Sequence, residues 1–171
     1  MPIVLLVLLA LATCSGALAL LRPLRRQSLV AAWVAWNLIL VVACILVALP
    51  TVLFGGSLVL ASFLVIAWSA LAGGPVVRLV LSMARRDGLE FPDGSLPASA
   101  WIGCLERAAI TLSLSLGLPE FAAILLGIKA LGQYSGGGNH HPAGRVLGTL
   151  TSTIWALLCF SVLHIAARGA L

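Results

Sequence analysis

Three charged residues stand inside apolar stretches in the second half of the chain. Glu106 and Arg107 are neighbours, and Lys129 follows in the next apolar run. Charges at the centre of a bilayer each cost roughly 2.5–3.5 kcal/mol, so they need partners or a purpose. A carboxylate with two cations could relay a proton or an ion, or anchor a charged substrate. The alternative is a salt bridge that fixes helix register, and the sequence favours this structural interpretation of the cluster.

The spacing of this cluster around a turn predicts one specific pair. Glu106 lies 12 residues before Leu118, and Lys129 lies 11 residues after it. In an antiparallel hairpin that turns near Leu118, the two side chains stand at nearly the same depth. We therefore expect an ion pair between Glu106 and Lys129. Arg107 points about 100° away around the helix, and we expect it to extend toward the lipid headgroups.

Glu120 and His164 are secondary candidates. Glu120 follows Pro119 in the first turn of a predicted helix, where its charge complements the helix dipole. His164 is expected near the same side of the membrane, so the two could meet and form a proton site. The dipole accounts for Glu120 without any further role.

No residue pattern in the chain predicts catalysis. The serines and threonines in apolar runs have no base and acid nearby in sequence, so no hydrolase arrangement can be built from them. The four cysteines, Cys14, Cys44, Cys104 and Cys159, are far apart and lack metal-ligand spacing. The sequence predicts no catalytic, cofactor-binding or metal-binding residue, and it leans against an enzyme.

The composition indicates a membrane protein. Of 171 residues, 61% are hydrophobic and 9% are charged, whereas soluble domains carry about 25% charged residues. The net charge of +5 does not indicate nucleic acid, because the charges sit beside apolar runs, where orientation signals and headgroup contacts belong. The expected partner is therefore a lipid bilayer. The richness in Arg, Ala, Leu and Gly favours a bacterium and hence a bacterial plasma (inner) membrane.

The apolar runs predict an all-α, polytopic transmembrane bundle of about six spans in a single membrane domain, 1–171. From Gln27 to Val77 there is no charge for 51 residues, or about 75 Å of helix, so the chain must fold back, and Pro50 marks the turn. The first run is interpreted as a retained helix rather than a signal peptide, because no basic residue precedes Arg22. The predicted spans are about 2–21, 28–49, 52–72, 100–116, 119–132 and 144–167.

Gly73-Gly74-Pro75 is predicted to end the third span. The following stretch, 75–86, has its polar residues on one helical face, which is typical of a basic amphipathic helix at the headgroup level. The alternative is that it simply extends the third span.

The arginines predict an orientation. If the first basic loop, around Arg22, is cytoplasmic, then all but one of the loop arginines fall on that side, and both termini are external. The cytoplasmic set is Arg22, Arg25, Arg26, Arg78, Arg85, Arg86 and Arg145, with Arg168 outside.

Small residues at every fourth position predict close helix packing. One stripe is Ala109, Ser113 and Gly117, and the other is Gly144, Gly148 and Ser152. Asn37, an amide inside a span, is expected to hydrogen-bond to a neighbouring helix.

Residues of about 99–163 resemble a family of uncharacterised bacterial integral membrane proteins. The resemblance rests on Ile102-Gly103-Cys104-Leu105-Glu106-Arg107, Gly127-Ile128-Lys129-Ala130 and Val146-Leu147-Gly148-Thr149-Leu150. The first helix lacks the His and Asp that this family has there. The resemblance implies no activity, only that Glu106, Arg107 and Lys129 belong together.

Taken together, these patterns favour a non-enzymatic membrane protein, either the subunit of a larger assembly or a self-associating bundle. Its partner would then be another membrane protein or a second copy. The alternative is a small transporter or channel that uses Glu106, Arg107 and Lys129 as its polar site.

Overall fold

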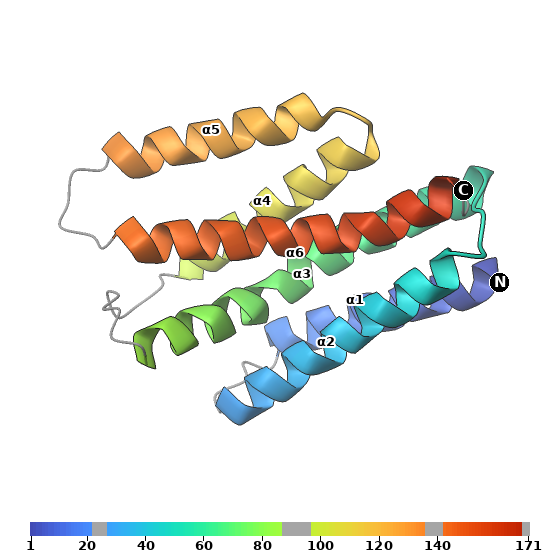
Figure 1. Ribbon diagram of the computed structural model, residues 1–171, viewed down its shortest axis with the longest axis horizontal. Helices are drawn as coiled ribbons and strands as arrows, with labels where there is room; N and C mark the ends of the chain where they lie inside the picture. Colours follow the sequence, from blue (N-terminus) through green and yellow to red (C-terminus); the bar gives the residue numbers. More distant parts are fainter. Residues whose placement is uncertain (22–26, 87–96, 136–141, 169–171) are drawn as a thin grey trace.

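The computed structural model describes residues 1–21, 27–86, 97–135 and 142–168, and every element in them is an α helix. The helices lie side by side along one long axis, and the start of the first and the end of the last lie at the same end (Figure 1). This arrangement confirms the predicted all-α helical bundle. The helices are α1 (Pro2–Leu21), α2 (Gln27–Ala48), α3 (Gly55–Arg86), α4 (Pro97–Ser115), α5 (Pro119–Ser135) and α6 (Pro142–Arg168).

Proline and glycine set the helix boundaries. Four helices begin at a proline, which has no N–H to satisfy and a backbone angle already suited to a first turn. Gly55 begins α3 with φ of 54°, and Gly117 makes the α4–α5 turn with φ of 74°. Side chains disfavour this left-handed region, so both turns depend on glycine.

Helix α3 differs from the prediction, because it passes through Gly73-Gly74-Pro75 without ending and continues to Arg86. The predicted helix end at Gly73-Gly74-Pro75 is therefore wrong, and the stretch 75–86 instead extends the same helix, which is the alternative that the sequence left open. A proline is tolerated inside a membrane helix when neighbouring groups satisfy the backbone that it disturbs. At 32 residues, α3 is about 48 Å long and exceeds a hydrocarbon core of about 30 Å.

The far part of α3 is tied to the beginning of α2. The Gln27 side-chain amide donates to Ser82 Oγ at 2.9 Å, and Arg86 donates to the Gln27 side-chain oxygen. These bonds hold the end of α3 inside the bundle. Along its length α3 also packs against α1, α4 and α6, which makes it the central helix.

Two tryptophans and one amide form the centre of the core. Trp68 of α3 and Trp155 of α6 meet edge to face, with ring centroids 5.9 Å apart and planes at 86°. The Trp68 indole N–H donates to Asn37 Oδ1 at 3.1 Å, and Ser15 Oγ lies 3.1 Å from the same oxygen. Asn37 thus joins α1, α2 and α3, as expected for an amide within a span.

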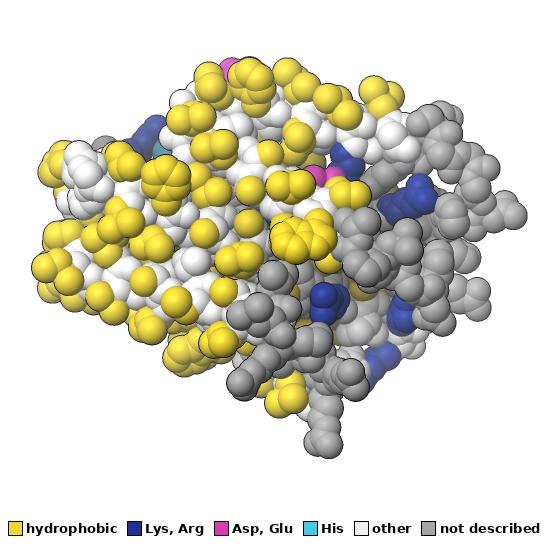
Figure 2. Space-filling view, turned by 180° about the vertical axis from the view of Figure 1, so that it is seen from behind, with side chains coloured by type: hydrophobic (Ala, Val, Ile, Leu, Met, Phe, Trp, Pro, Cys, Tyr) yellow, Lys and Arg dark blue, Asp and Glu magenta, His cyan; other side chains and the backbone are white. Residues whose placement is uncertain are grey.

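The surface of the bundle is apolar. Large hydrophobic side chains are exposed on all six helices, Leu46, Phe63, Leu105 and Ile128 among them. Figure 2 shows hydrophobic side chains over much of the visible surface, with most of the visible basic side chains toward one end and one beside a histidine at the other. Such a surface suits lipid rather than water.

Within the described residues, four helices are long and apolar enough to cross a membrane: α1, α2, α3 and α6. The other two, α4 and α5, do not reach that standard. They form a hairpin whose Ile110 and Ala122 pack with Ala156 of α6 in a second, smaller apolar cluster.

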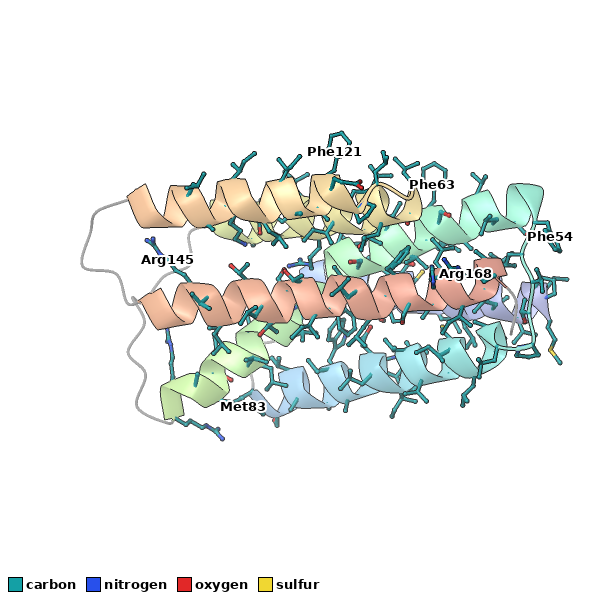
Figure 3. All side chains as sticks on the ribbon, turned by 45° about the horizontal axis from the view of Figure 1, so that its top comes forward. Phe54, Phe63, Met83, Phe121, Arg145 and Arg168 are labelled. Atoms are coloured by element: carbon teal, nitrogen blue, oxygen red, sulfur yellow. The ribbon has the colours of Figure 1, made fainter. Side chains whose placement is uncertain are left out.

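We call the end of the bundle that carries Arg78, Arg85, Arg86 and Arg145 the basic end. The opposite end, where α1 begins and α6 finishes, is the terminal end. Figure 3 shows Met83 and Arg145 toward the basic end, and Phe54 and Arg168 toward the terminal end. At the terminal end, the backbone N–H of Leu53 donates to the carbonyl of Ala166 at 3.0 Å and joins the α2–α3 turn to α6.

Candidate functional site: a polar seam with a cavity at each end

The α4–α5 hairpin brings Glu106 and Lys129 together. Their side chains form an ion pair, as the residue count around the turn predicts. The turn is closed by backbone bonds from Gly117 to Leu114 and from Leu118 to Ser113, and this short closure places the two residues at one depth. The side chains are 18% exposed for Glu106 and 23% for Lys129, so the pair borders on open space.

Arg107 does not extend toward the headgroups, and that expectation is wrong. Its side chain points into the bundle and is 3% exposed. Its Nε lies 3.0 Å from the Ser69 carbonyl oxygen, and its Nη2 lies 2.6 Å from that of Ala70. The guanidinium also contacts Ser152 Oγ and Cys104 Sγ, each at 3.4 Å. Arg107 therefore links α4 to both α3 and α6.

Helix α3 is shaped to receive this guanidinium. A Cβ atom at Gly73 would lie 2.3 Å from Arg107 Nε, so only glycine leaves enough room. Pro75, two residues further on, has no N–H. The carbonyl of Leu71, four residues before it, therefore lacks its usual helical hydrogen bond. Gly73-Gly74-Pro75, which the sequence predicts to end a helix, instead lies within α3 at the place where the Arg107 side chain of α4 packs.

A line of polar side chains runs along one face of α4. Arg107, Thr111 and Ser115 are four residues apart and so lie on the same face. Thr111 Oγ1 lies 2.8 Å from Ser69 Oγ and also bonds to the Arg107 carbonyl. Thr111 and Ser69 are fully buried. We call this line, with Ser69 and Ser152, the polar seam between α3, α4 and α6.

At the basic end the seam opens into a cavity of about 370 Å³. Its wall comes from α3, α4, α5 and α6, and Arg107 lines its inner part. The charged residues in the wall are Arg78, Glu106, Arg107, Lys129 and Arg145.

At the terminal end the seam opens into a second cavity, of about 400 Å³. Ser62, Ser115 and His164 line it, together with Arg168. The two cavities share no lining residue. Between them lie the fully buried Thr111 and Ser69, so the seam is closed at its centre.

Glu120 and His164 do not meet. Glu120 is exposed in the first turn of α5, and no hydrogen bond or ion pair joins it to His164 within the residues described. The His164 ring instead stacks at a tilt on Phe160, with centroids 5.5 Å apart.

The two small-residue stripes have different roles. On α6, Gly144 and Ser152 are buried, and a Cβ at Gly148 would lie 3.8 Å from Val77 of α3. On α4, Ser113 is buried and Ala109 is partly buried. Gly117 does not pack against another helix, because it is exposed. Its positive φ instead makes the α4–α5 turn.

Sequence reasoning missed Arg78, Arg145 and Ser69 as members of the site. They come from separate helices, and no local pattern joins them. The four-residue spacing of Arg107, Thr111 and Ser115 is a signal that could have pointed to the seam. Comparison with protein-family models, with curated proteins and with solved structures finds no match to this chain.

Proposed function

We propose that this protein is a small membrane transporter in which a polar solute passes along the seam between α3, α4 and α6. The observation that carries the proposal is the pair of cavities, one at each end of a single polar face of α4, with a closed layer between them. Transporters bind their solute near the middle of the membrane and expose it to one side at a time. Two cavities separated by Thr111 and Ser69 are the arrangement that such a cycle needs.

The proposal includes six crossings with the basic end in the cytoplasm. Lys and Arg accumulate on the cytoplasmic side of membrane proteins, and the arginines of the basic end outnumber Arg168 at the other. The α4–α5 hairpin lies against α3 and α6, which supports its burial in the same membrane. Because the hairpin leaves and returns to the same end, α6 keeps its direction whether or not the hairpin crosses fully.

We also propose that the chain is related to the family of membrane proteins with an Ile-Gly-x-Leu-Glu-Arg helix. Its motif, from Ile102 to Arg107, covers the turn of α4 that faces the basic-end cavity, in which Ile102, Gly103, Glu106 and Arg107 are lining residues. On this proposal the motif serves to build this site.

Cysteine labelling tests the transport cycle without knowledge of the solute. In a background with the four native cysteines replaced by alanine, Thr111→Cys reports the closed layer, while Ala100→Cys and Ser115→Cys report the two cavities. Membrane vesicles of each orientation are treated with a small, charged, impermeant methanethiosulfonate. We expect Ala100→Cys to react from one side, Ser115→Cys from the other, and Thr111→Cys slowly from both.

Val65→Cys is the matched control, because Val65 is as buried as Thr111 but lies in the apolar core. A rigid bundle would leave both Thr111→Cys and Val65→Cys unlabelled while the cavity positions react. That result would reject the transporter. It would support instead the subunit of a larger assembly or the self-associating bundle that the sequence favours.

A further inference from the structure

The basic-end cavity holds an excess of positive charge among its described lining residues. Four cations line it, Arg78, Arg107, Lys129 and Arg145, against one carboxylate, that of Glu106. Glu106 and Lys129 neutralise each other in their ion pair, whereas Arg78 of α3 and Arg107 of α4 form no ion pair within the residues described.

Arg107 is the deepest of these charges, and it forms no ion pair within the residues described. The four groups that it contacts are two backbone carbonyls, a hydroxyl and a thiol, all of which are uncharged. These dipoles accept hydrogen bonds from Arg107 but leave its net charge in place, and Nη1 has one such acceptor for its two N–H groups. A buried charge without an opposite charge is costly, so an anion in the cavity would complete the site.

The dimensions of the cavity limit the size of that anion. Its wall on α6 extends from Gly144 to Ser152, a rise of about 12 Å along the helix axis. A volume of about 370 Å³ lies near the lower limit of ligand pockets, which span about 300–1,000 Å³. The site therefore suits a small ion or a single polar head with a short apolar attachment.

The arrangement of the arginines distinguishes between anions. A carboxylate has two oxygens in one plane, and a single arginine can serve both. A phosphate has oxygens pointing in several directions, and arginines on different helices, Arg78 on α3 and Arg107 on α4, offer donors from separate sides. Ser152 adds a hydroxyl beside Arg107. Val77, Leu81 and Ile102 supply an apolar part of the wall.

We infer that the basic-end cavity binds a phosphate group, with Arg78 and Arg107 as its principal ligands. Phosphate chemistry has two possible sources here: a soluble phosphate or phosphomonoester, and the headgroup of an anionic lipid, which basic pockets between membrane helices also bind. The inference rests on the proposed function in one respect, since it names the solute class for the same site. Binding itself requires no transport.

The test measures binding to purified full-length protein in an uncharged detergent. In one arm, inorganic phosphate or glycerol 3-phosphate is titrated while thermal unfolding is followed. In the other, protein from vesicles of phosphatidylglycerol and phosphatidylcholine is examined by native mass spectrometry for retained lipid. A saturable rise in melting temperature identifies a soluble ligand, and selective retention of phosphatidylglycerol identifies a lipid headgroup. Either result supports the phosphate site.

Arg78→Gln is the informative variant because Arg78 is exposed on α3 and its loss leaves the core intact. We expect it to weaken binding about tenfold, as for the loss of one charge-assisted hydrogen bond. Arg168→Gln, which removes the same charge at the terminal end, should bind as the unaltered protein does. Arg107→Lys keeps the charge but loses the planar fork, and should also weaken binding.

Two results would overturn the inference: no response in either arm, or equal binding by Arg78→Gln and Arg168→Gln. The outcomes are separable from those of the labelling experiment. Phosphate binding with an unreactive Thr111→Cys would retain the site and reject transport. A reactive Thr111→Cys without phosphate or phosphatidylglycerol binding would retain transport and reject this ligand.

Discussion

Gly73 lies so close to the guanidinium of Arg107 that a Cβ atom added to it would be 2.3 Å from Nε and 2.4 Å from Cδ. The neighbouring Gly74 has nothing within 4 Å of the corresponding position. One glycine of the pair thus makes room for a charge from another helix, and the other does not.

This difference predicts opposite results for two alanine substitutions. Both gain helix propensity of about 1 kcal/mol. Gly73→Ala must also displace Arg107 from the Ser69 and Ala70 carbonyls, and overpacking of this kind costs about 1–3 kcal/mol. We expect Gly73→Ala to lower the melting temperature in detergent and Gly74→Ala to leave it unchanged or raise it. Equal melting temperatures for Gly73→Ala and Gly74→Ala would mean that the Arg107 side chain does not pack against Gly73.

A double-mutant cycle measures the Glu106–Lys129 ion pair. Glu106→Gln and Lys129→Met each leave an unpaired charge between α4 and α5, whereas the double variant leaves none. We expect the double variant to be more stable than the sum of the single effects predicts, by about 0.5–3 kcal/mol. Unfolding from mixed micelles provides the free energies.

Glu120→Gln is the control for this cycle, because Glu120 is exposed and forms no ion pair within the described residues. It should change stability little, and its combination with Lys129→Met should be additive. Additivity of Glu106→Gln with Lys129→Met would show that the pair contributes nothing to stability.

The two core tryptophans predict unequal responses to phenylalanine. Trp68 and Trp155 are both fully buried, but the indole N–H of Trp68 donates to Asn37, whereas that of Trp155 has no partner within the described residues. A buried unsatisfied donor costs about 1–3 kcal/mol. Trp155→Phe removes that cost along with some volume, while Trp68→Phe removes a bond of about 0.5–1.5 kcal/mol.

We therefore expect Trp155→Phe to be the more stable variant by about 1 kcal/mol or more, in the same unfolding assay. The comparison is matched because the volume change is identical. If Trp155→Phe unfolded more readily than Trp68→Phe, the Trp155 indole N–H would have a partner in the membrane, such as a buried water.

The length of α3 predicts that its ends are exposed on opposite sides of the membrane. Phe54 just precedes the helix and Met83 lies near its other end, and both are exposed. In a background without native cysteines, an impermeant maleimide should reach Phe54→Cys and Met83→Cys from opposite faces of sealed vesicles. Reaction of both from one face would exclude α3 as a membrane-crossing helix.

The helices at 2–21 and near 28–49, 119–132 and 144–167 follow from the sequence because their boundaries are local. A proline begins three of these helices, and a mainly apolar run fills each of the four. The Glu106–Lys129 pair is also predictable, since a short hairpin leaves one register for residues equally distant from its turn. Both predictions need only neighbouring residues and the periodicity of a helix.

The continuity of α3 and the direction of Arg107 could not be predicted in this way, and the two failures have one cause. Gly73-Gly74-Pro75 reads as a helix end when α3 is considered alone. In the bundle, α4 supplies a guanidinium that bonds to the Ser69 and Ala70 carbonyls of α3, and Gly73 leaves the space for it. The wall of the basic-end cavity likewise combines residues from four helices, so it exists only after they have packed.

The α4–α5 hairpin begins and ends at the same end of the bundle, and this bears on how the protein could evolve. A hairpin of this kind can be gained, lost or replaced without inverting any other part of the chain. The remaining helices, α1, α2, α3 and α6, are the four in the described part of the chain that are long and apolar enough to cross a membrane, and they share one core. The hairpin supplies both charges of the ion pair and the buried arginine. Evolution could therefore have changed the chemistry of the site by exchanging one removable segment while the orientation of the protein stayed the same.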